Sequence, residues 1–258
     1  MANLIIVGSG IKMAAHLTQE AVGWIKSAGK VFYVANNALV AVHIQLMNDT
    51  AEDLSSHYAE GKHRQKTYDG MVEQVVNCLH DVEHVCVVFY GHPSVFVTPA
   101  PKMIQLARER GHQAEILPGI SAEDCLFSDL AIDPAEYGCQ SYEATDFLWR
   151  PRVWDVHSGL VLWQVGVIGH FTAPNEPIKE VGIRLLVERL LELYPAEHEV
   201  IIYEAAVSIL SQPRIEKLPL AELASARLTQ ISTLYIPPVK MAPLDPQIYQ
   251  KFIDEGKE

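Results

Sequence analysis

The sequence predicts an α/β protein with two lobes, a parallel-sheet N-terminal lobe and a mixed or antiparallel, α+β C-terminal lobe. Strand-like and helix-like segments alternate over the first 118 residues, and strand-like segments outnumber helices beyond Pro118-Gly119. Such alternation is typical of a mainly parallel sheet covered by helices on both faces. We therefore expect one lobe over residues 1–118, a second over 119–240 and a tail over 241–258.

The elements of the first lobe follow from short apolar runs separated by segments with helical patterning. We expect strands at Leu4–Val7, Val31–Ala35, Val85–Tyr90 and Gln113–Leu117, and helices at Ala14–Ala28, Thr67–Leu79 and Pro101–Arg110. The third strand runs into the turn Gly91-His92-Pro93. Open α/β sheets bind their ligands at turns of this kind, although an ordinary loop is the alternative.

The second lobe is predicted from a helix and four short strand-like segments. The helix is expected at Ser121–Leu130, and the strands at Gly159–Val165, Glu199–Tyr203, Arg214–Leu218 and Gln230–Tyr235. An apolar stripe from Ile178 to Leu190, opened by Asn175 and Pro177, indicates a further helix. The segment after Pro237-Pro238 is expected to be a surface tail.

The composition excludes several classes of partner. The 258 residues include 32 acidic and 20 basic side chains, which give a formal net charge of −12. A surface that follows nucleic-acid phosphates needs clustered lysine and arginine, so we expect no nucleic-acid partner. The apolar run at the amino terminus, Leu4–Val7, is too short for a signal peptide or a membrane span. We expect a cytoplasmic protein that does not bind membranes.

Two short motifs suggest cofactors that the rest of the sequence does not support. Gly8-Ser9-Gly10 follows the first strand, but Met13 replaces the third glycine of a dinucleotide-binding loop. A tight turn that packs strand on helix is the alternative. His80 and His84 match a zinc-protease pattern, without an obvious third ligand nearby in the sequence. We expect neither a nicotinamide cofactor nor a metal.

A group of tyrosine and arginine side chains lies between the second and third strands. Arg64 and Tyr68 are four residues apart and would share one face of a helix, and Tyr58 precedes them. A guanidinium beside a phenol lowers the phenol's pKa below its usual value of about 10. From the pattern alone, a surface cation and an ordinary aromatic side chain are the commoner explanation.

A resemblance to a known family covers nearly the whole chain. The blocks VGSGI, FYGHPSVF, LPGISAEDCLFSDL, YEATDF, LVLWQVG, IIYEAA and ISTLYIPP occur in the order expected for the tetrapyrrole-methylase superfamily of S-adenosylmethionine-dependent enzymes. More closely, the chain resembles the methyltransferase domain of borosins, which N-methylate peptide backbone amides. Most superfamily members carry G-D-P where this chain has Gly91-His92-Pro93, whereas borosins have G-H-P. The resemblance implies a cofactor cleft between two lobes.

The resemblance also implies the site residues. The cofactor would be bound by Tyr90, His92, Val95, Phe96, Ser121, Ala122, Gln164, Tyr203, Ala205, Ser232 and Thr233. The implied catalytic group is Tyr58, Arg64, Tyr68 and Tyr90. A further tyrosine of some relatives corresponds to Ser55 here, which puts an obligatory role for that phenol in doubt.

These residue types suit methylation of an amide. A peptide nitrogen is a poor nucleophile because its lone pair is delocalised into the carbonyl group. As a hypothesis, Tyr68 removes the amide proton with help from Arg64, while Tyr58 or Arg64 donates a hydrogen bond to the carbonyl oxygen. Tyr90 would align the methyl group. The product would be S-adenosyl-L-homocysteine, and no metal is required.

The chain ends about twenty residues beyond ISTLYIPP, without the core peptide that many borosins carry at their carboxyl terminus. We therefore expect a split system that acts in trans, and iteratively, on a separate precursor peptide with a docking region, in ribosomal peptide natural-product biosynthesis. By the same resemblance we expect a homodimer, able to form a heterotetramer with two precursors. Two alternatives stay open: a methyltransferase acting on a small molecule such as a tetrapyrrole, and a non-catalytic cofactor-binding partner protein.

Overall fold

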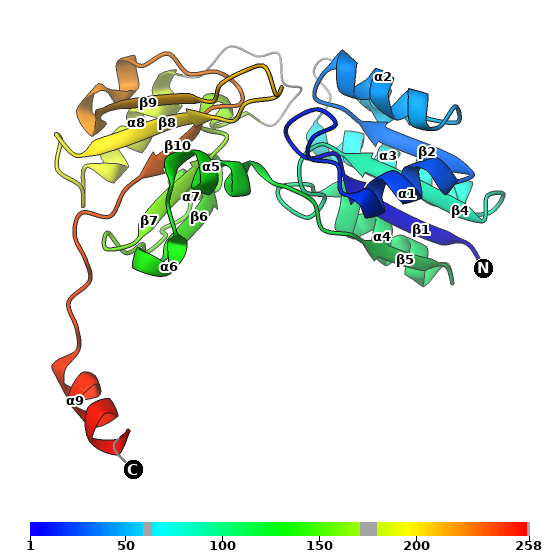
Figure 1. The fold of residues 1–258 in the computed structure, drawn as a ribbon. Helices are drawn as coiled ribbons and strands as arrows, with labels where there is room; N and C mark the ends of the chain where they lie inside the picture. Colours follow the sequence, from blue (N-terminus) through cyan, green and yellow to red (C-terminus); the bar gives the residue numbers. More distant parts are fainter. Residues whose placement is uncertain (59–62, 171–179, 257–258) are drawn as a thin grey trace. The chain divides into compact units, whose positions relative to one another are not determined.

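The computed structural model describes residues 1–58, 63–170 and 180–256, which form two compact units. The first unit comprises Met1–Ile132, His170–Pro177 and Glu204–Arg214. The second comprises Asp133–Gly169, Ile178–Tyr203 and Ile215–Glu258. Each unit has its own sheet, one parallel and one mixed, which confirms the predicted α/β class (Figure 1).

The sheet of the first unit has five strands in the order β3-β2-β4-β1-β5, and every neighbouring pair is parallel. The strands are β1 (Asn3–Gly8), β2 (Lys30–Val34), β3 (Glu52–Asp53), β4 (His84–Phe89) and β5 (Gln113–Ile116). Their carboxyl ends therefore lie at one edge of the sheet. This edge is where an open parallel sheet places its ligands.

Helices cover both faces of this sheet (Figure 1). Leu4 and Ile6 of β1 are buried in one core with α3 (Arg64–Cys78) and α4 (Pro99–Glu109), whereas Ile5 and Val7 are buried in another core with α1 (Gln19–Ser27) and α2 (Ala38–Met47). Because successive side chains of a strand point to opposite faces, a continuous apolar run is what a sheet buried on both sides requires.

The first helix begins later than the sequence pattern predicts. The expected start was Ala14, but this residue has a left-handed backbone (φ 59°), which a continuous helix excludes. His16 stabilises the preceding turn, since its Nδ1 accepts hydrogen bonds from the backbone N–H groups of Ile11 (3.3 Å) and Lys12 (3.2 Å). The helix starts after Thr18, whose side chain caps it.

Two glycine turns meet at the carboxyl edge of the parallel sheet. Gly10 and Gly91 exchange backbone hydrogen bonds, with N···O distances of 3.2 and 3.1 Å. A Cβ atom on Gly8 would lie 2.2 Å from the carbonyl oxygen of Gly91 and 2.9 Å from Pro93 Cδ. Gly8 is therefore needed for contact between the two turns, rather than for the packing of strand on helix that the motif suggested.

The second unit is built around the mixed sheet, with the order β6-β7-β10-β8-β9. Strands β6 and β7 are parallel, and β10 is antiparallel to both β7 and β8. The strands are β6 (Cys139–Glu143), β7 (Gly159–Trp163), β8 (Glu199–Glu204), β9 (Arg214–Pro219) and β10 (Thr233–Ile236). Leu160, Leu162, Ile202 and Leu234 form one core with α8 (Glu180–Leu190).

Several elements were not predicted. They are α2, β3, β6, α6 (Pro134–Tyr137), α7 (Ala144–Trp149), α9 (Pro246–Glu255) and the short 3-10 helices η1 (Leu54–His57), η2 (Val165–Val167) and η3 (Leu220–Ser225). The expected tail contains the capped helix α9, because Asp245 accepts hydrogen bonds from the backbone of Gln247 and Ile248. The start signal at Asn175 and Pro177 lies outside the described residues.

The first unit extends beyond the boundary expected at residue 118. Helix α5 (Ala122–Leu130) belongs to it, since the unit continues to Ile132. The segment Glu204–Arg214 also belongs to it, and the backbone N–H of Met13 donates to the carbonyl of Val207 (3.1 Å). Within the described ranges, none of the helices is long and apolar enough to cross a membrane.

Candidate active site

A pocket of about 170 Å³ opens at the carboxyl edge of the parallel sheet in the first unit. Val34 ends β2 and Phe89 ends β4, so the pocket lies where these two neighbouring strands finish. Its lining combines three phenols with apolar side chains: Val34, Tyr58, Tyr68, Met71, Phe89, Tyr90, Phe96, Val97 and Pro99. Three residues of the expected catalytic group, Tyr58, Tyr68 and Tyr90, are thus brought together.

Each phenol comes from a different element. Tyr58 is the residue that caps η1, and its backbone N–H donates to Ser55 O (3.0 Å). Tyr68 lies in the second turn of α3, and Tyr90 directly follows β4. Neither η1 nor the spacing between these elements has a sequence signature. The pocket is assembled by the packing of α3 and η1 on the sheet.

Tyr58 and Tyr68 are hydrogen-bonded to each other through their side chains. Burial raises the pKa of Tyr58 to about 12, Tyr68 adds to this rise, and the positive charge of Arg64 opposes it. Tyr58 therefore keeps its proton at neutral pH and can donate it in a hydrogen bond. This favours a donor role for Tyr58 over a role as a base.

Tyr90 is held by a residue that follows the neighbouring strand. Burial raises the pKa of Tyr90, while a side-chain hydrogen bond with Asn36 opposes the rise. Asn36 comes two residues after β2, at the same edge of the sheet. Tyr90 is thus a second protonated phenol in this pocket, with the Asn36 amide close to its hydroxyl.

The raised pKa of Tyr58 predicts a decline of stability in alkali. The folded protein retains a proton up to about pH 12 that the unfolded chain loses near pH 10, the usual value for tyrosine. Between these values the folded state binds more protons, so the free energy of unfolding must fall as the pH rises. Urea unfolding from pH 9 to pH 12 should show a shallower decline for Tyr58→Phe than for the wild type. Equal slopes would contradict the assignment.

Arg64 is the first residue of α3, one helical turn before Tyr68, because the helix begins three residues earlier than the start expected at Thr67. It is half-buried and close enough to Tyr58 to influence its ionisation, but it does not line the pocket. His63 caps the helix by accepting a hydrogen bond from the backbone of Gln65 (3.2 Å). The structure therefore places the guanidinium group near the phenols without bringing it into the pocket wall.

The expected cofactor residues of the first unit are in turns at the ends of strands. His92 Nδ1 accepts a hydrogen bond from Ser94 N (3.0 Å), and Val95 N donates to His92 O (3.1 Å). Phe96 lines the pocket with a left-handed backbone (φ 56°), which is a costly conformation for a bulky residue. Such strain is concentrated at functional sites.

Ser121, Ala122 and Ala205 do not line this pocket. Ser121 caps α5 through a capping box with Asp124, in which each side chain accepts from the other residue's backbone. Its hydroxyl also donates to Asp124 (2.7 Å). Ala122 is the first residue of α5, and Ala205 directly follows β8. The Ser121 side chain is therefore engaged in holding its own helix.

The remaining cofactor residues lie at one edge of the sheet in the second unit. Tyr203 of β8 is paired with Thr233 of β10, and both are buried. Gln164 directly follows β7 with a left-handed backbone (φ 60°). Ser232 directly precedes β10, and its Oγ accepts a hydrogen bond from Thr229 N (2.8 Å). The structure thus brings these four residues to a common edge.

The sequence did not single out several pocket residues. Val34, Met71, Phe89, Val97 and Pro99 look like ordinary core or turn residues in the sequence. Asn36 could have been found, because polar residues directly after a parallel strand lie at the edge where ligands bind. The apolar wall residues carry no such signal.

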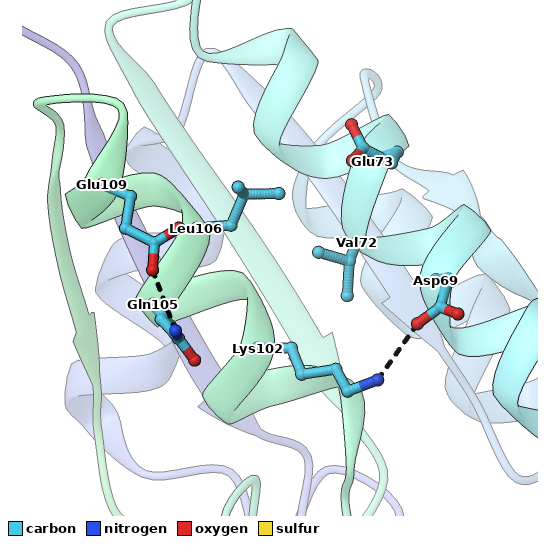
Figure 2. A pocket seen from close by; sticks show the side chains of 7 residues that line it. All are labelled: Asp69, Val72, Glu73, Lys102, Gln105, Leu106 and Glu109. Carbon is cyan, nitrogen blue, oxygen red and sulfur yellow. Dashed lines mark hydrogen bonds and ion pairs between the residues drawn. The ribbon is translucent and has the colours of Figure 1, made fainter.

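A second pocket, of about 250 Å³, lies between α3 and α4 on the same unit (Figure 2). Its polar groups bind one another: Lys102 forms an ion pair with Asp69 (3.0 Å), and Gln105 donates to Glu109 (2.8 Å). Glu73 is paired with Arg110 (3.0 Å). This groove is a solvated contact between two helices. The pocket lined by Tyr58, Tyr68 and Tyr90, which we call the tyrosine pocket, is the stronger candidate site.

Curated relatives resemble the chain along most of its length. It is 42% identical over 245 residues to the methyltransferase/ribosomally synthesized cyclic peptide gymnopeptides precursor of Gymnopus fusipes, covering 93% of this chain and 58% of that protein. The corresponding omphalotin A precursor of Omphalotus olearius is 41% identical over 242 residues, covering 92% and 58%. The dendrothelin A precursor of Dendrothele bispora is 38% identical over 261 residues, covering 99% and 63%. The chain thus spans about three fifths of their length.

Solved structures share the fold at low sequence identity. The uroporphyrin-III-C-methyltransferase from Thermus thermophilus superposes with a TM-score of 0.68 at 17% identity, covering 95% of this chain and 99% of that one. A diphthine synthase superposes with a TM-score of 0.64 at 11% identity, covering 93% and 92%. The family model described as Tetrapyrrole (Corrin/Porphyrin) Methylases matches residues 3–224. Because this match covers well over half of the chain, the protein belongs to the tetrapyrrole methylase family.

Proposed function

We propose that this protein is an S-adenosylmethionine-dependent methyltransferase that N-methylates backbone amides of a ribosomally made precursor peptide. The observation that carries the proposal is the pocket in which Tyr58, Tyr68 and Tyr90 meet at the ligand-binding edge of a parallel sheet. The names of relatives about 40% identical, which join a methyltransferase to a cyclic-peptide precursor, support the peptide as substrate.

Each of the two sheet edges, taken by itself, carries residue types that suit parts of the donor. Tyr90, Val95 and Phe96 offer aromatic and apolar surface for an adenine, and Gln164 offers an amide for a polar group. Ser121 and Ser232 use their hydroxyls within the fold, so they would contribute mainly through their backbone. The bound donor supplies an electrophilic methyl group on sulfur, and S-adenosyl-L-homocysteine is the product.

The three phenols and Arg64 each have a separate role in activating the amide. Tyr68 is assigned the amide proton, as the family resemblance implies, and it acts as a phenolate to accept that proton. Tyr58 donates a hydrogen bond, and the Arg64 guanidinium favours the negative charge that develops on the amide. Tyr90 orients the reacting groups. The apolar wall excludes water and strengthens each of these interactions.

The substrate is tested by mixing the purified protein and S-adenosylmethionine with short peptides encoded beside its gene. Mass steps of one methyl group, located on backbone nitrogens by fragmentation, are the expected result, and several steps on one peptide would show iteration. Each peptide is supplied both separately and joined to the carboxyl terminus, which tests the proposal that the protein acts in trans. Methylation of a tetrapyrrole instead would overturn the peptide assignment. Donor binding without methylation of any acceptor would favour a non-catalytic role.

The charge geometry of Arg64 can be tested by Arg64→Lys. Lysine keeps the positive charge but not the planar fork that binds two acceptor sites. We expect kcat to fall toward the roughly 100-fold loss that removal of an oxyanion donor causes. The exposed Arg184 on α8 provides a matched control, since Arg184→Lys should leave kcat unchanged. Equal kcat values for the two variants would contradict the role of Arg64.

The oligomeric state remains a proposal of its own. We propose a homodimer that binds two precursor peptides, and light scattering with and without the peptide would test it. A protein that remains monomeric with peptide bound would exclude both assemblies.

A further inference from the structure

A chain of polar contacts connects the parallel sheet to the turn that carries Tyr58. Lys30, at the start of β2, forms an ion pair with Glu52 of β3 (2.6 Å). Glu52 accepts a hydrogen bond from Gln74 Nε2 (2.6 Å), and Gln74 Oε1 lies 2.5 Å from His57 Nε2. His57 is the last residue of η1 and directly precedes Tyr58.

The ionised state of Glu52 fixes which group donates and which accepts in each of these polar contacts. A hydrogen bond from Lys30 lowers the pKa of Glu52, which therefore stays ionised and can only accept hydrogen bonds. Gln74 must then turn its NH₂ group toward Glu52 and its oxygen toward His57. As a result, His57 carries a proton on Nε2 and donates it to Gln74.

Packing holds the same imidazole from a second side. A Cβ atom on Gly70 would lie 2.8 Å from His57 Nδ1 and 3.2 Å from Cε1. The ring therefore rests directly on the backbone of α3 at a position where a side chain would displace it. The Thr67 hydroxyl also donates to His57 O (3.4 Å). His57 is thus attached to the helix that carries Tyr68.

We infer that Gln74 and Gly70 are positioning residues, which dock His57 on α3 and thereby hold the Tyr58 hydroxyl against Tyr68. Neither residue lines the tyrosine pocket, so both act through His57 and Tyr58. The inference rests on the proposed function for its effect on turnover, because the phenol pair is the proposed catalytic group. The geometry itself can be measured without any substrate.

The main test is a double-mutant cycle between Gln74→Met and Tyr58→Phe. Methionine keeps the length of the side chain but removes both hydrogen bonds. We expect Gln74→Met to lower kcat by between about 10-fold and 100-fold, as small misplacements in active sites do, with unchanged affinity for S-adenosylmethionine. In the Tyr58→Phe background the same change should alter kcat less than about twofold, because coupled residues are not additive. If kcat of the double variant instead falls by the product of the two single-variant effects, the two residues act independently and the inference is overturned.

Gly70→Ala is the second variant, and it separates positioning from loss of folding. Alanine is a better helix former than glycine, which offsets part of the cost of displacing His57, so the variant should remain folded at the assay temperature. It should nevertheless lose turnover, because its Cβ displaces the imidazole. Gln105→Met on α4, which removes only an exposed contact with Glu109, is the control for Gln74→Met. Full turnover in Gly70→Ala, or loss of turnover in the control, would overturn the inference.

Tyrosinate absorbance provides a measurement that is independent of methyl transfer. The difference between the titrations of wild type and Tyr58→Phe isolates the Tyr58 phenol, which should ionise near pH 12. In the Gln74→Met background this ionisation should move toward pH 10, the value of an unperturbed phenol. An unchanged ionisation would refute the positioning role even if no peptide is methylated, whereas a shift without methyl transfer would refute only the proposed function.

Discussion

Replacing Tyr68 with phenylalanine is expected to lower kcat for methyl transfer by about 10² to 10⁴, the range typical of a lost general base. The ring remains, so its apolar packing against the core of the first unit and the affinity for S-adenosylmethionine should be preserved. The Tyr58 hydroxyl loses its hydrogen-bond partner, which adds to the effect. The measurement is single-turnover kinetics at a saturating donor concentration, because this isolates the chemical step.

Tyr33→Phe is the matched control for Tyr68→Phe. Tyr33 lies in β2, and its hydroxyl accepts a hydrogen bond from Gln45 (2.9 Å), but it does not line the tyrosine pocket. Loss of the Tyr33 hydroxyl should lower the free energy of unfolding by about 1 kcal/mol, the usual contribution of a neutral hydrogen bond. It should leave kcat within about twofold, because Tyr33 does not line the pocket. Near-normal turnover in Tyr68→Phe would remove this phenol from the proton transfer, while the fold and family would stand.

Gly8→Ala is expected to have the largest effect on folding. The new Cβ would lie 2.2 Å from the carbonyl oxygen of Gly91, a backbone atom that cannot rotate away. The two turns must then separate, and with them the ends of β1 and β4, which are paired through Gly8 and Phe89. We expect a loss of about 3 kcal/mol in the free energy of unfolding, the upper end of the usual cost of overpacking. Urea unfolding measures it.

Gly23→Ala supplies the contrast for this prediction. Gly23 lies within α1, and an added Cβ would meet nothing within 4 Å. Alanine there should raise the free energy of unfolding by about 0.5–1 kcal/mol through helix propensity. The two glycine-to-alanine variants should therefore shift the unfolding midpoint in opposite directions. A shift in the same direction would show that the turns can separate at little cost.

Most of the parallel sheet was predictable because its signal is local, although its short edge strand β3 was missed. Four or more consecutive apolar residues, as in Leu4–Val7, are required of any strand that is buried on both faces. Helix α2 was missed because it has no charged residue and no single apolar stripe, since Leu39 and Leu46 are exposed while Val40 and Ile44 are buried. Periodicity cannot find a helix whose two faces are equally apolar.

The active site was predictable only in part. Arg64 and Tyr68 could be paired from their spacing on one helix, which the structure bears out in α3. The contact between Tyr58 and Tyr68 depends on how η1 folds back on that helix, and neither spacing nor composition encodes this. Only the family resemblance implied that Tyr58 and Tyr68 belong to one catalytic group. The roles of Gln74 and Gly70 depend on distances between side chains, so they required the structure.

The segment Glu204–Arg214 is the last of the three segments that make up the first unit, long after the chain first leaves that unit at Ile132. During synthesis, a ribosome must therefore deliver residue 214 before this unit can acquire all of its native neighbours. Until then, the turn after β1 lacks the partner that Val207 gives to Met13. A nascent chain stalled shortly after residue 132 should thus be more sensitive to proteases in that turn than the released protein.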